Sequence, residues 1–151
     1  MDLSGHLALI TGAGQGIGRA CAEVFALKGA DLVLLDKNPE TLAVTADKIA
    51  PMGRQVVTRA LDLTDVEALQ QTVMELKQKG RVDILVNNAG VMNTPKGKTE
   101  DGFETQFGIN YLGHFLLTEM LLDVLKASAP SRIVCVSSLA HAGMQKRSAT
   151  I

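Results

Sequence analysis

The sequence predicts an α/β fold in which a doubly wound parallel sheet lies between two layers of helices. Three observations predict it. Apolar runs alternate with helical patterns, several of these runs are continuously apolar, and a glycine-rich turn joins the first run to the first helix. Continuously apolar strands are typical of sheets covered on both faces. The 151 residues suffice for one domain with a buried core, expected over 1–143 and followed by an unpatterned tail over 144–151.

The expected strands are the apolar runs Leu7–Thr11, 32–35, 55–61, 82–87 and 131–137. Helical patterns fill the intervals over 16–28, from Pro39 to Pro51, from Thr64 to 79, and over 99–126.

Local signals mark the ends of these helices. Gly29 follows the first helix as a C-terminal glycine, and Pro39 takes the favoured first-turn position of the second. Thr64 is expected to cap the third helix, with Glu67 completing a capping box. One face of the first helix is expected from the spacing of Ile17, Cys21, Val24, Phe25 and Lys28.

Composition and charge exclude several classes of function. A net charge of −1 gives no electrostatic basis for nucleic-acid binding. No apolar run approaches the ~20 residues of a membrane span, and the first strand begins too early to leave room for a signal peptide. Cys21 and Cys135 lie among apolar neighbours, which predicts buried free thiols and a cytoplasmic protein. His114 and His141 are not at ligand spacing with other donors, so no metal site is expected.

The turn after the first strand reads Thr11-Gly12-Ala13-Gly14-Gln15-Gly16-Ile17-Gly18. It does not fit G-x-G-x-x-G, because Ile17 stands where the third glycine would fall, but it fits T-G-x-x-x-G-x-G. The glycines permit a sharp exit from the strand, a close approach of backbone to phosphate, and close packing of the helix. The helix N–H groups then face an anion. The turn therefore predicts a Rossmann-type dinucleotide site built from Gly12, Gln15, Gly16, Ile17 and Gly18.

Asp36 ends the second apolar run and indicates which dinucleotide is bound. A carboxylate at this place accepts hydrogen bonds from both ribose hydroxyls and repels a 2′-phosphate. NAD is therefore favoured over NADP. Lys37 and Arg59 keep NADP open as an alternative, because a nearby cation accommodates a phosphate.

Further segments follow the same order as in one known family. They are Thr11 to Gly18, Asp62-Leu63 after the third strand, Asn87-Asn88-Ala89-Gly90 after the fourth, Asn110, and Ser137-Ser138 after the fifth. On these residues the chain resembles the short-chain dehydrogenase/reductase family over nearly its full length. Its second half is similar to the retinol-dehydrogenase-like branch, through Asn88-Ala89-Gly90-Val91-Met92, Asn110-Tyr111-Leu112-Gly113-His114-Phe115, Ser128-Ala129-Pro130-Ser131-Arg132 and Ser137-Ser138-Leu139-Ala140-His141.

The resemblance implies roles for individual residues. Asp62 would bond the adenine ring, and the Leu63 backbone would line the same pocket. The adenosine side of the cofactor would be held by Asn88, Ala89 and Gly90. Asn110 would belong to the catalytic tetrad and hold a water or a backbone kink, and Ser138 would orient the substrate carbonyl or hydroxyl. Asn110 falls on the apolar-leaning stripe of its helix, so a buried and satisfied asparagine is expected.

The family's Tyr-x-x-x-Lys motif, which transfers a proton beside the hydride, is not found after Ser138. The sequence has one tyrosine, Tyr111, followed four residues on by Phe115. We therefore expect a C-terminally truncated domain with little turnover of its own, and an apolar fifth strand left as an exposed edge. The alternatives are a non-catalytic dinucleotide-binding module or an interaction partner that forms a homo-oligomer or pairs with a full-length relative. A nucleotide-sugar epimerase is disfavoured by Asn-Asn-Ala-Gly.

Overall fold

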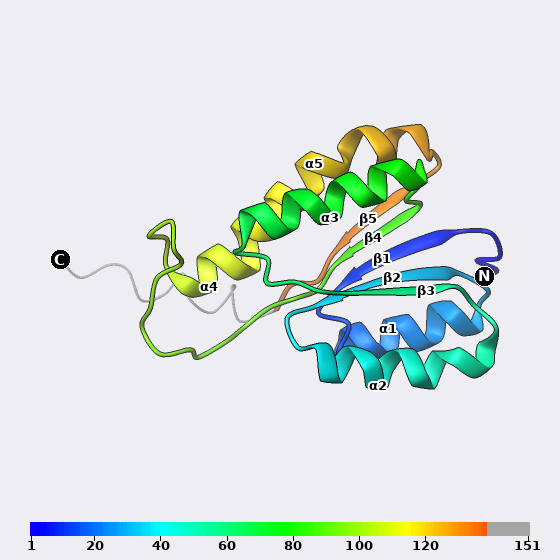
Figure 1. Ribbon diagram of the computed structural model, residues 1–151, viewed down its shortest axis with the longest axis horizontal. Coiled ribbons are helices and arrows are strands. Elements are labelled where there is room, and N and C mark those ends of the chain that lie inside the picture. Colours follow the sequence, from blue (N-terminus) through cyan, green and yellow to red (C-terminus); the bar gives the residue numbers. More distant parts are fainter. Residues whose placement is uncertain (139–151) are drawn as a thin grey trace.

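The computed structural model describes residues 1–138 and contains a five-stranded parallel sheet in that part of the chain (Figure 1). The strand order is β3-β2-β1-β4-β5. The fold class predicted from the sequence is therefore confirmed, whereas the tail over 144–151, the domain end at 143 and His141 lie outside the described residues. The strands are β1 (Leu7–Thr11), β2 (Asp31–Asp36), β3 (Val56–Ala60), β4 (Ile84–Asn87) and β5 (Arg132–Cys135).

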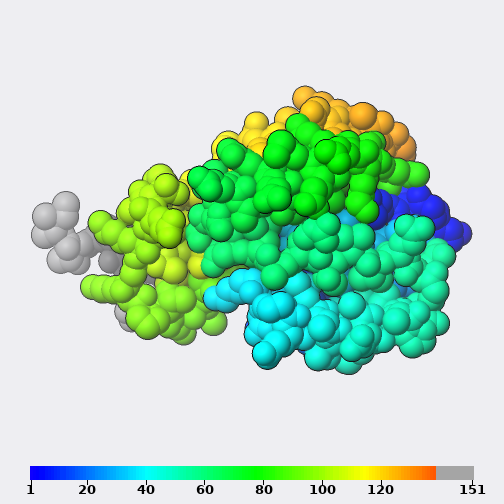
Figure 2. Space-filling model, viewed as in Figure 1, coloured from blue at the N-terminus to red at the C-terminus, as the bar shows by residue number. Residues whose placement is uncertain are grey.

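Helices cover both faces of the sheet. One face carries α1 (Gly16–Leu27) and α2 (Pro39–Ile49), with the short helix η1 (Ala50–Met52) after α2. The other face carries α3 (Val66–Lys79) and α5 (His114–Ala127), as Figure 1 shows. In the space-filling view, the cyan-to-green residues of α2, β3 and α3 lie on the near face, and α5 lies behind α3 along the upper edge (Figure 2).

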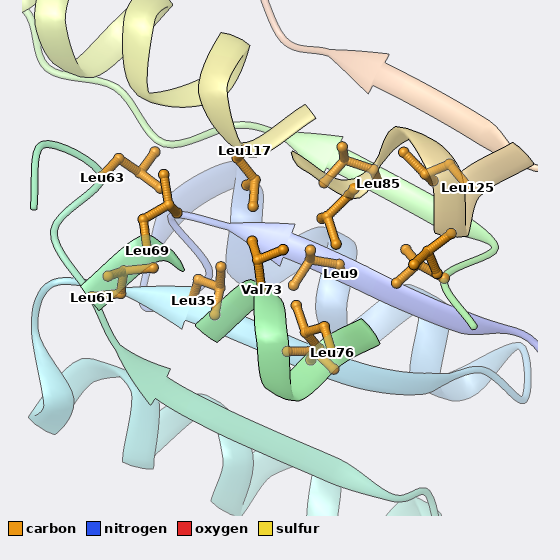
Figure 3. Close-up of a cluster of buried hydrophobic side chains, with 14 residues drawn as sticks. Leu9, Leu35, Leu61, Leu63, Leu69, Val73, Leu76, Leu85, Leu117 and Leu125 are labelled. Carbon is orange, nitrogen blue, oxygen red and sulfur yellow. The ribbon is translucent and has the colours of Figure 1, made fainter. Parts of the chain in front are cut away.

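Each face of the sheet has its own hydrophobic core. On the α3/α5 side, leucines from three strands meet leucine and valine side chains from both helices, as Figure 3 shows. Burial of each such side chain contributes about 1.5–3 kcal/mol. The residues on this side include Leu9, Leu35, Leu85, Leu69, Val73, Leu76, Leu117 and Leu125. The core under α1 and α2 includes Ala8, Ile10, Leu32, Leu34, Leu42 and Ile49.

The buried face of α1 differs from the face predicted by apolar spacing. Gly18, Ala22 and Ala26 are buried, whereas Ile17 is 61% exposed and Val24 is 51% exposed. Small side chains let the helix axis come close to the sheet and to the turn that precedes it. The predicted face is therefore wrong for Ile17 and Val24, whereas Cys21 and Phe25 are half-buried and pack against the core under α1 and α2.

The cap of α3 is Asp65 and not Thr64. The Asp65 carboxylate accepts the N–H of Ala68 at 2.9 Å. The Thr64 hydroxyl and N–H instead donate to Asp62 Oδ1, at 2.8 and 2.9 Å. The predicted Thr64–Glu67 capping box is therefore wrong, because Asp62 holds Thr64 in the preceding turn.

The long helix predicted over 99–126 is broken near its start. Helix α4 (Thr105–Phe107) is capped by Glu104, whose carboxylate accepts the N–H groups of Gln106 and Phe107 at 2.9 and 2.7 Å. A π-helical turn, η2 (Gly108–Gly113), then leads into α5. Wide turns of this kind occur frequently at functional sites.

Strand β5 is the edge of the sheet in the part of the chain that the structure describes. Ile133, Val134 and Val136 are each between 42% and 46% exposed, as expected for an apolar edge. Cys135 is also exposed and Cys21 is half-buried, so the prediction of two buried thiols is wrong for Cys135. Among the described helices, we find none with the length and apolar character that crossing a bilayer requires.

Replacement of Asp65 by alanine is expected to lower the free energy of unfolding by about 1 kcal/mol, because the first turn of α3 loses its side-chain cap. The matched control is Thr64→Ala, which leaves the Asp65 cap in place. Urea unfolding followed by circular dichroism measures both variants. An equal or larger loss for Thr64→Ala would contradict the cap assignment.

Candidate functional site

A pocket of about 290 Å³ opens at the carboxyl ends of β1, β2, β3 and β4. This edge contains the point where the strand order reverses, between β1 and β4, which is where open α/β sheets bind ligands. Nine of the residues predicted as cofactor-binding line it: Gly12, Gln15, Ile17, Asp36, Asp62, Leu63, Asn88, Ala89 and Gly90. The structure therefore brings together residues that are up to 78 positions apart in sequence.

The turn after β1 is pressed against the loop after β4. A Cβ added at Gly12, where φ is +65°, would lie 2.8 Å from the Cα of Ala89. One at Gly18 would collide with the Gly12 carbonyl and lie 2.6 Å from the Asn88 amide nitrogen. Both positions therefore require glycine. The close neighbours of Gly18 belong to the turn and to the loop after β4.

Helix α1 starts without a side-chain cap. Its N-cap residue, Gln15, makes no side-chain hydrogen bond to the first turn, and that turn contains no acidic residue. In contrast, α2 and α3 are capped by Asn38 and Asp65. The first N–H groups of a helix lack intrahelical partners, so those of α1 remain available to an anion. Gly16, at φ +54°, presents no side chain there, and a Cβ at this position would meet no atom within 4 Å.

Asp36 faces the same turn from the end of β2. Its Oδ2 accepts the N–H of Gly14 at 2.9 Å, and its Oδ1 accepts the N–H of Asn38 at 3.0 Å. A carboxylate has about four acceptor positions, so each oxygen retains capacity for a further donor. Asp36 is therefore fixed in orientation by backbone groups and still lines the pocket.

The cations near Asp36 differ in how firmly they are held. Arg59 donates twice to Glu75 Oε2, at 3.0 and 2.7 Å. Arg19 donates to the Thr45 hydroxyl at 3.0 Å and also to the Gly14 carbonyl. Lys37 is exposed and lines the pocket. Lys37 is therefore the pocket-lining cation beside Asp36, whereas Arg59 has a carboxylate partner.

Asp62 and Leu63 follow β3 on the far wall of the pocket. Thr64 orients the Asp62 carboxylate by donating twice to its Oδ1. Leu63 is 6% exposed and belongs to the core under α3 and α5. The wall therefore combines a fixed carboxylate with an apolar surface.

Thr11 joins the end of β1 to the loop after β4. Its hydroxyl oxygen accepts the N–H of Asn88 at 2.9 Å and the N–H of Ala89 at 3.0 Å. The Asn88 side-chain amide returns two bonds, to the carbonyls of Thr11 and Gly12, at 3.0 and 3.3 Å. The predicted cofactor residues Asn88 and Ala89 are therefore positioned by Thr11 and by the glycine turn.

Asn110 lies in the π-helical turn and is exposed, contrary to the expectation of a buried asparagine. Its side chain nevertheless forms two hydrogen bonds with the backbone of Val91. Oδ1 accepts the N–H of Val91 at 2.8 Å, and Nδ2 donates to the Val91 carbonyl at 2.8 Å. A Cβ at Gly90 would lie 3.4 Å from this Oδ1. Asn110 thus ties the π turn to the pocket wall, while its neighbour Ile109 lines the pocket.

Ser138 follows β5 at the carboxyl end of the sheet and is exposed. It does not line the pocket described above, and neither does Asn110. Sequence reasoning missed several positions at the site, which apolar lining or local bonding reveals only in three dimensions. They are Leu35, Leu61, Val91 and Ile109 as lining residues, with Arg19 and Thr45 bracing the turn.

His114, the first residue of α5, is 8% exposed. Its Nε2 lies 2.9 Å from the Thr11 hydroxyl, and its Nδ1 lies 3.3 Å from the Asn110 carbonyl. Burial lowers the pKa of His114 below its ordinary value, and the bond to the Asn110 carbonyl opposes this shift. Within residues 1–138, no cluster of three or more histidine, cysteine, aspartate or glutamate side chains has the geometry to hold a metal ion.

Comparison with known families gives a match over most of the chain. Residues 6–149 match the model of the short chain dehydrogenase family. The chain is 47% identical over 142 residues to retinol dehydrogenase 13 of Mus musculus, covering 92% of this chain and 42% of that protein. It is 44% identical over 144 residues to retinol dehydrogenase 11 of Homo sapiens, covering 93% and 45%. The chain therefore spans less than half the length of these curated relatives.

Solved structures give the same fold. NAD⁺-bound xylitol dehydrogenase superposes with a TM-score of 0.82 at 29% identity, covering 94% of this chain and 56% of that one. Carveol dehydrogenase from Mycobacterium avium in complex with NAD gives a TM-score of 0.68 at 32% identity, covering 82% and 50%. The retinol-dehydrogenase-like resemblance and the Rossmann-type fold are thus both confirmed.

The buried histidine makes stability depend on pH. An unfolded histidine takes up a proton as the pH falls through about 6.5, whereas burial holds the pKa of His114 lower in the folded chain. The unfolded state then binds more protons, so the free energy of unfolding falls as the pH drops below about 6.5. Urea unfolding at about pH 7.5 and about pH 5.5 should show a larger loss for the wild type than for His114→Gln, which does not titrate. Equal losses would contradict this linkage.

Proposed function

Because this chain belongs to the short chain dehydrogenase family, we propose that its pocket binds NAD(H), in preference to NADP(H), for hydride exchange with an alcohol or carbonyl substrate. The observation that carries the proposal is the junction of three features at one pocket. These are the uncapped start of α1, the Asp36 carboxylate at the end of β2, and the acidic and apolar wall of Asp62 and Leu63.

The residues present fit a dinucleotide. The diphosphate would be held by the N–H groups at the start of α1, where Gly16 leaves the backbone open. Ile17 lines the pocket at this turn and is 61% exposed, so a bound ligand would bury its apolar side chain. Asp62 and Leu63 would hold the adenine from the opposite wall. When bound, the nicotinamide supplies or accepts the hydride.

Asp36 supports NAD over NADP. Its carboxylate is oriented by the Gly14 and Asn38 N–H groups and keeps acceptor capacity for ribose hydroxyls. A 2′-phosphate at this place would meet that negative charge. Arg59, the second cation considered from the sequence, is engaged by Glu75. Lys37 is the remaining candidate for a phosphate contact, and we propose that Asp36 outweighs it.

We further propose that Asn110 and Ser138 belong to the reaction side of the site, as the family resemblance implies. The Asn110 side chain is occupied by Val91, so its contribution would be to fix the π turn beside the pocket. Ser138 follows β5, at the sheet edge that faces ligands in this fold. Relatives named retinol dehydrogenases support an apolar alcohol, such as a retinoid, as the substrate class.

A non-catalytic dinucleotide-binding module is the second candidate, and the position of Tyr111 is the observation behind it. The one tyrosine of the sequence, Tyr111, is stacked between Phe107 and Phe115, with ring centroids at 5.3 and 6.2 Å. It does not line the pocket. These 151 residues thus contain no tyrosine placed for proton transfer beside the described pocket.

Titration with NADH and NADPH, followed by nucleotide fluorescence, tests the binding proposal. The wild type is expected to bind NADH more tightly, and Asp36→Asn to bind NADH about tenfold more weakly, because a hydrogen bond to a charged group contributes about 1.5–3 kcal/mol. The matched control is Lys37→Ala, which should leave the NADH affinity within about twofold. A folded wild type that binds neither nucleotide would refute the proposed function.

Gly16→Val is expected to abolish measurable NADH binding, because a branched side chain would cover the start of α1. Its control is Gly53→Val, which also replaces a glycine at positive φ with open space around its Cβ, but outside the pocket. Both variants carry similar backbone strain. Equal NADH affinities for the two would contradict the proposed diphosphate position.

A protein made of these 151 residues is expected to oxidise alcohols slowly. A positioned general acid–base group contributes about 10²–10⁴-fold to rate, and Tyr111 is not at the pocket. Steady-state assays with NAD and an apolar alcohol, run beside a full-length relative, measure the difference. A rate equal to that of the relative would favour the enzyme over the binding module.

A further inference from the structure

We propose that His114 is a positioning residue of the dinucleotide site. Its ring is a neutral imidazole protonated on Nδ1, whose Nε2 accepts a hydrogen bond from the Thr11 hydroxyl and whose Nδ1–H donates one to the Asn110 carbonyl. The ring would thereby join the end of β1 to the π-helical turn. Through the Thr11 hydroxyl, it would also be linked to the loop after β4. The tautomer follows from the hydrogen bonds around the ring, and its effect on nucleotide affinity rests on the proposed function.

The Thr11 hydroxyl oxygen lies among four hydrogen-bonding neighbours. A hydroxyl has one proton to donate and two lone pairs with which to accept. Backbone N–H groups can only donate, and those of Asn88 and Ala89 both point at this oxygen, at 2.9 and 3.0 Å. Both lone pairs are therefore occupied. The oxygen has no acceptor position left for a proton carried by His114.

The Thr11 hydroxyl can donate one hydrogen bond, for which there are two candidate acceptors. The two remaining neighbours of the Thr11 oxygen are His114 Nε2 at 2.9 Å and the Val86 carbonyl at 3.3 Å. The shorter contact is with the ring nitrogen. Because the Thr11 oxygen cannot accept a hydrogen bond from Nε2, this contact is a hydrogen bond only if Nε2 is unprotonated and accepts the hydrogen bond that the hydroxyl donates.

The other ring nitrogen of His114, Nδ1, faces a backbone carbonyl. Nδ1 lies 3.3 Å from the Asn110 carbonyl, which can only accept, so Nδ1 carries the proton. The backbone N–H of His114 bonds instead to the Tyr111 carbonyl. The imidazole therefore reaches the carbonyl four residues back, which the backbone N–H of His114 would take in a regular α-helix.

These hydrogen bonds link His114 to the pocket wall through Thr11. Asn88 and Ala89 line the pocket and depend on the Thr11 oxygen for their N–H groups. An oxygen that donates its own proton becomes a stronger acceptor, because chained hydrogen bonds polarise one another. The same ring bonds to the backbone carbonyl of Asn110, whose side chain forms hydrogen bonds with the Val91 backbone. Burial also favours the neutral form of His114, since it lowers the pKa.

The tautomer can be read directly by NMR on the ¹⁵N-labelled full chain. Long-range ¹H–¹⁵N correlations of the imidazole ring are expected to show an unprotonated Nε2 and a protonated Nδ1 for His114. The internal control is His6, whose Nδ1 lies near the exposed Ser4 carbonyl. A protonated Nε2 on His114 at neutral pH would overturn the proposal, and no variant is needed for this measurement.

A double-mutant cycle on NADH affinity tests the effect on the site. Thr11→Val removes the hydroxyl, and His114→Phe removes both ring nitrogens while keeping a planar side chain. If the two residues act together, the product of the single-variant losses should exceed the loss of the double variant by about fivefold, equivalent to one hydrogen bond of about 1 kcal/mol. His114→Gln, whose side-chain oxygen can accept from Thr11, should recover part of the His114→Phe loss.

The outcomes separate this inference from the proposed function. A folded wild type without affinity for NADH refutes the function, while the ring spectrum still decides the tautomer. A wild type that binds NADH, with strictly multiplicative losses in the cycle and no recovery by glutamine, overturns the positioning role. If His114→Phe does not fold, His114→Leu, which also lacks both ring nitrogens, replaces it in the cycle with Thr11→Val, and multiplicative losses there overturn the positioning role equally.

Discussion

The close approach of the turn after β1 to the loop after β4 is the constraint on which the rest of the structure depends. Gly12 and Gly18 leave no space for a Cβ at this junction, and the Asn88 side chain bonds two of the carbonyls that the glycines leave accessible. The Thr11 hydroxyl joins the same two segments from inside. Because this junction lies where the strand order reverses, its geometry determines the floor of the pocket.

Two kinds of packing hold that junction in place. Large leucine and valine side chains fill the space between the sheet and α3 and α5, where close-packed burial gives most of the stability (Figure 3). Under α1 the contact is made by Gly18, Ala22 and Ala26. Small residues bring the helix close, and this closeness aims its first turn at the pocket. The apolar cores thus position a pocket whose lining combines polar groups, such as Asp36 and Asp62, with apolar side chains, such as Leu61 and Ile109.

The sequence predicted the fold and the pocket walls well because both follow local rules. Continuous apolar runs identify parallel strands, and residues just after such strands meet at one edge of the sheet. Prediction failed where a tertiary contact overrode a local preference. The Thr64 hydroxyl bonds to Asp62 and therefore does not cap α3, and Asn110 lies in the π turn at the surface. The hydrogen bond between His114 and Thr11 could not be foreseen, because it joins residues 103 positions apart in sequence.

Asp36 both supports the glycine turn and lines the pocket, which has a consequence for the cofactor choice proposed above. Its carboxylate braces the Gly14 N–H in the glycine turn, and a Cβ at Gly14 would lie within 2.8 Å of its Oδ2. Under the proposed function, replacing this acid by a cation to admit a 2′-phosphate would also remove the acceptor of the Gly14 N–H. Nucleotide selectivity and the conformation of the glycine turn would then depend on the same side chain. An uncharged acceptor at position 36, with Lys37 beside it, would keep the Gly14 hydrogen bond while removing the negative charge.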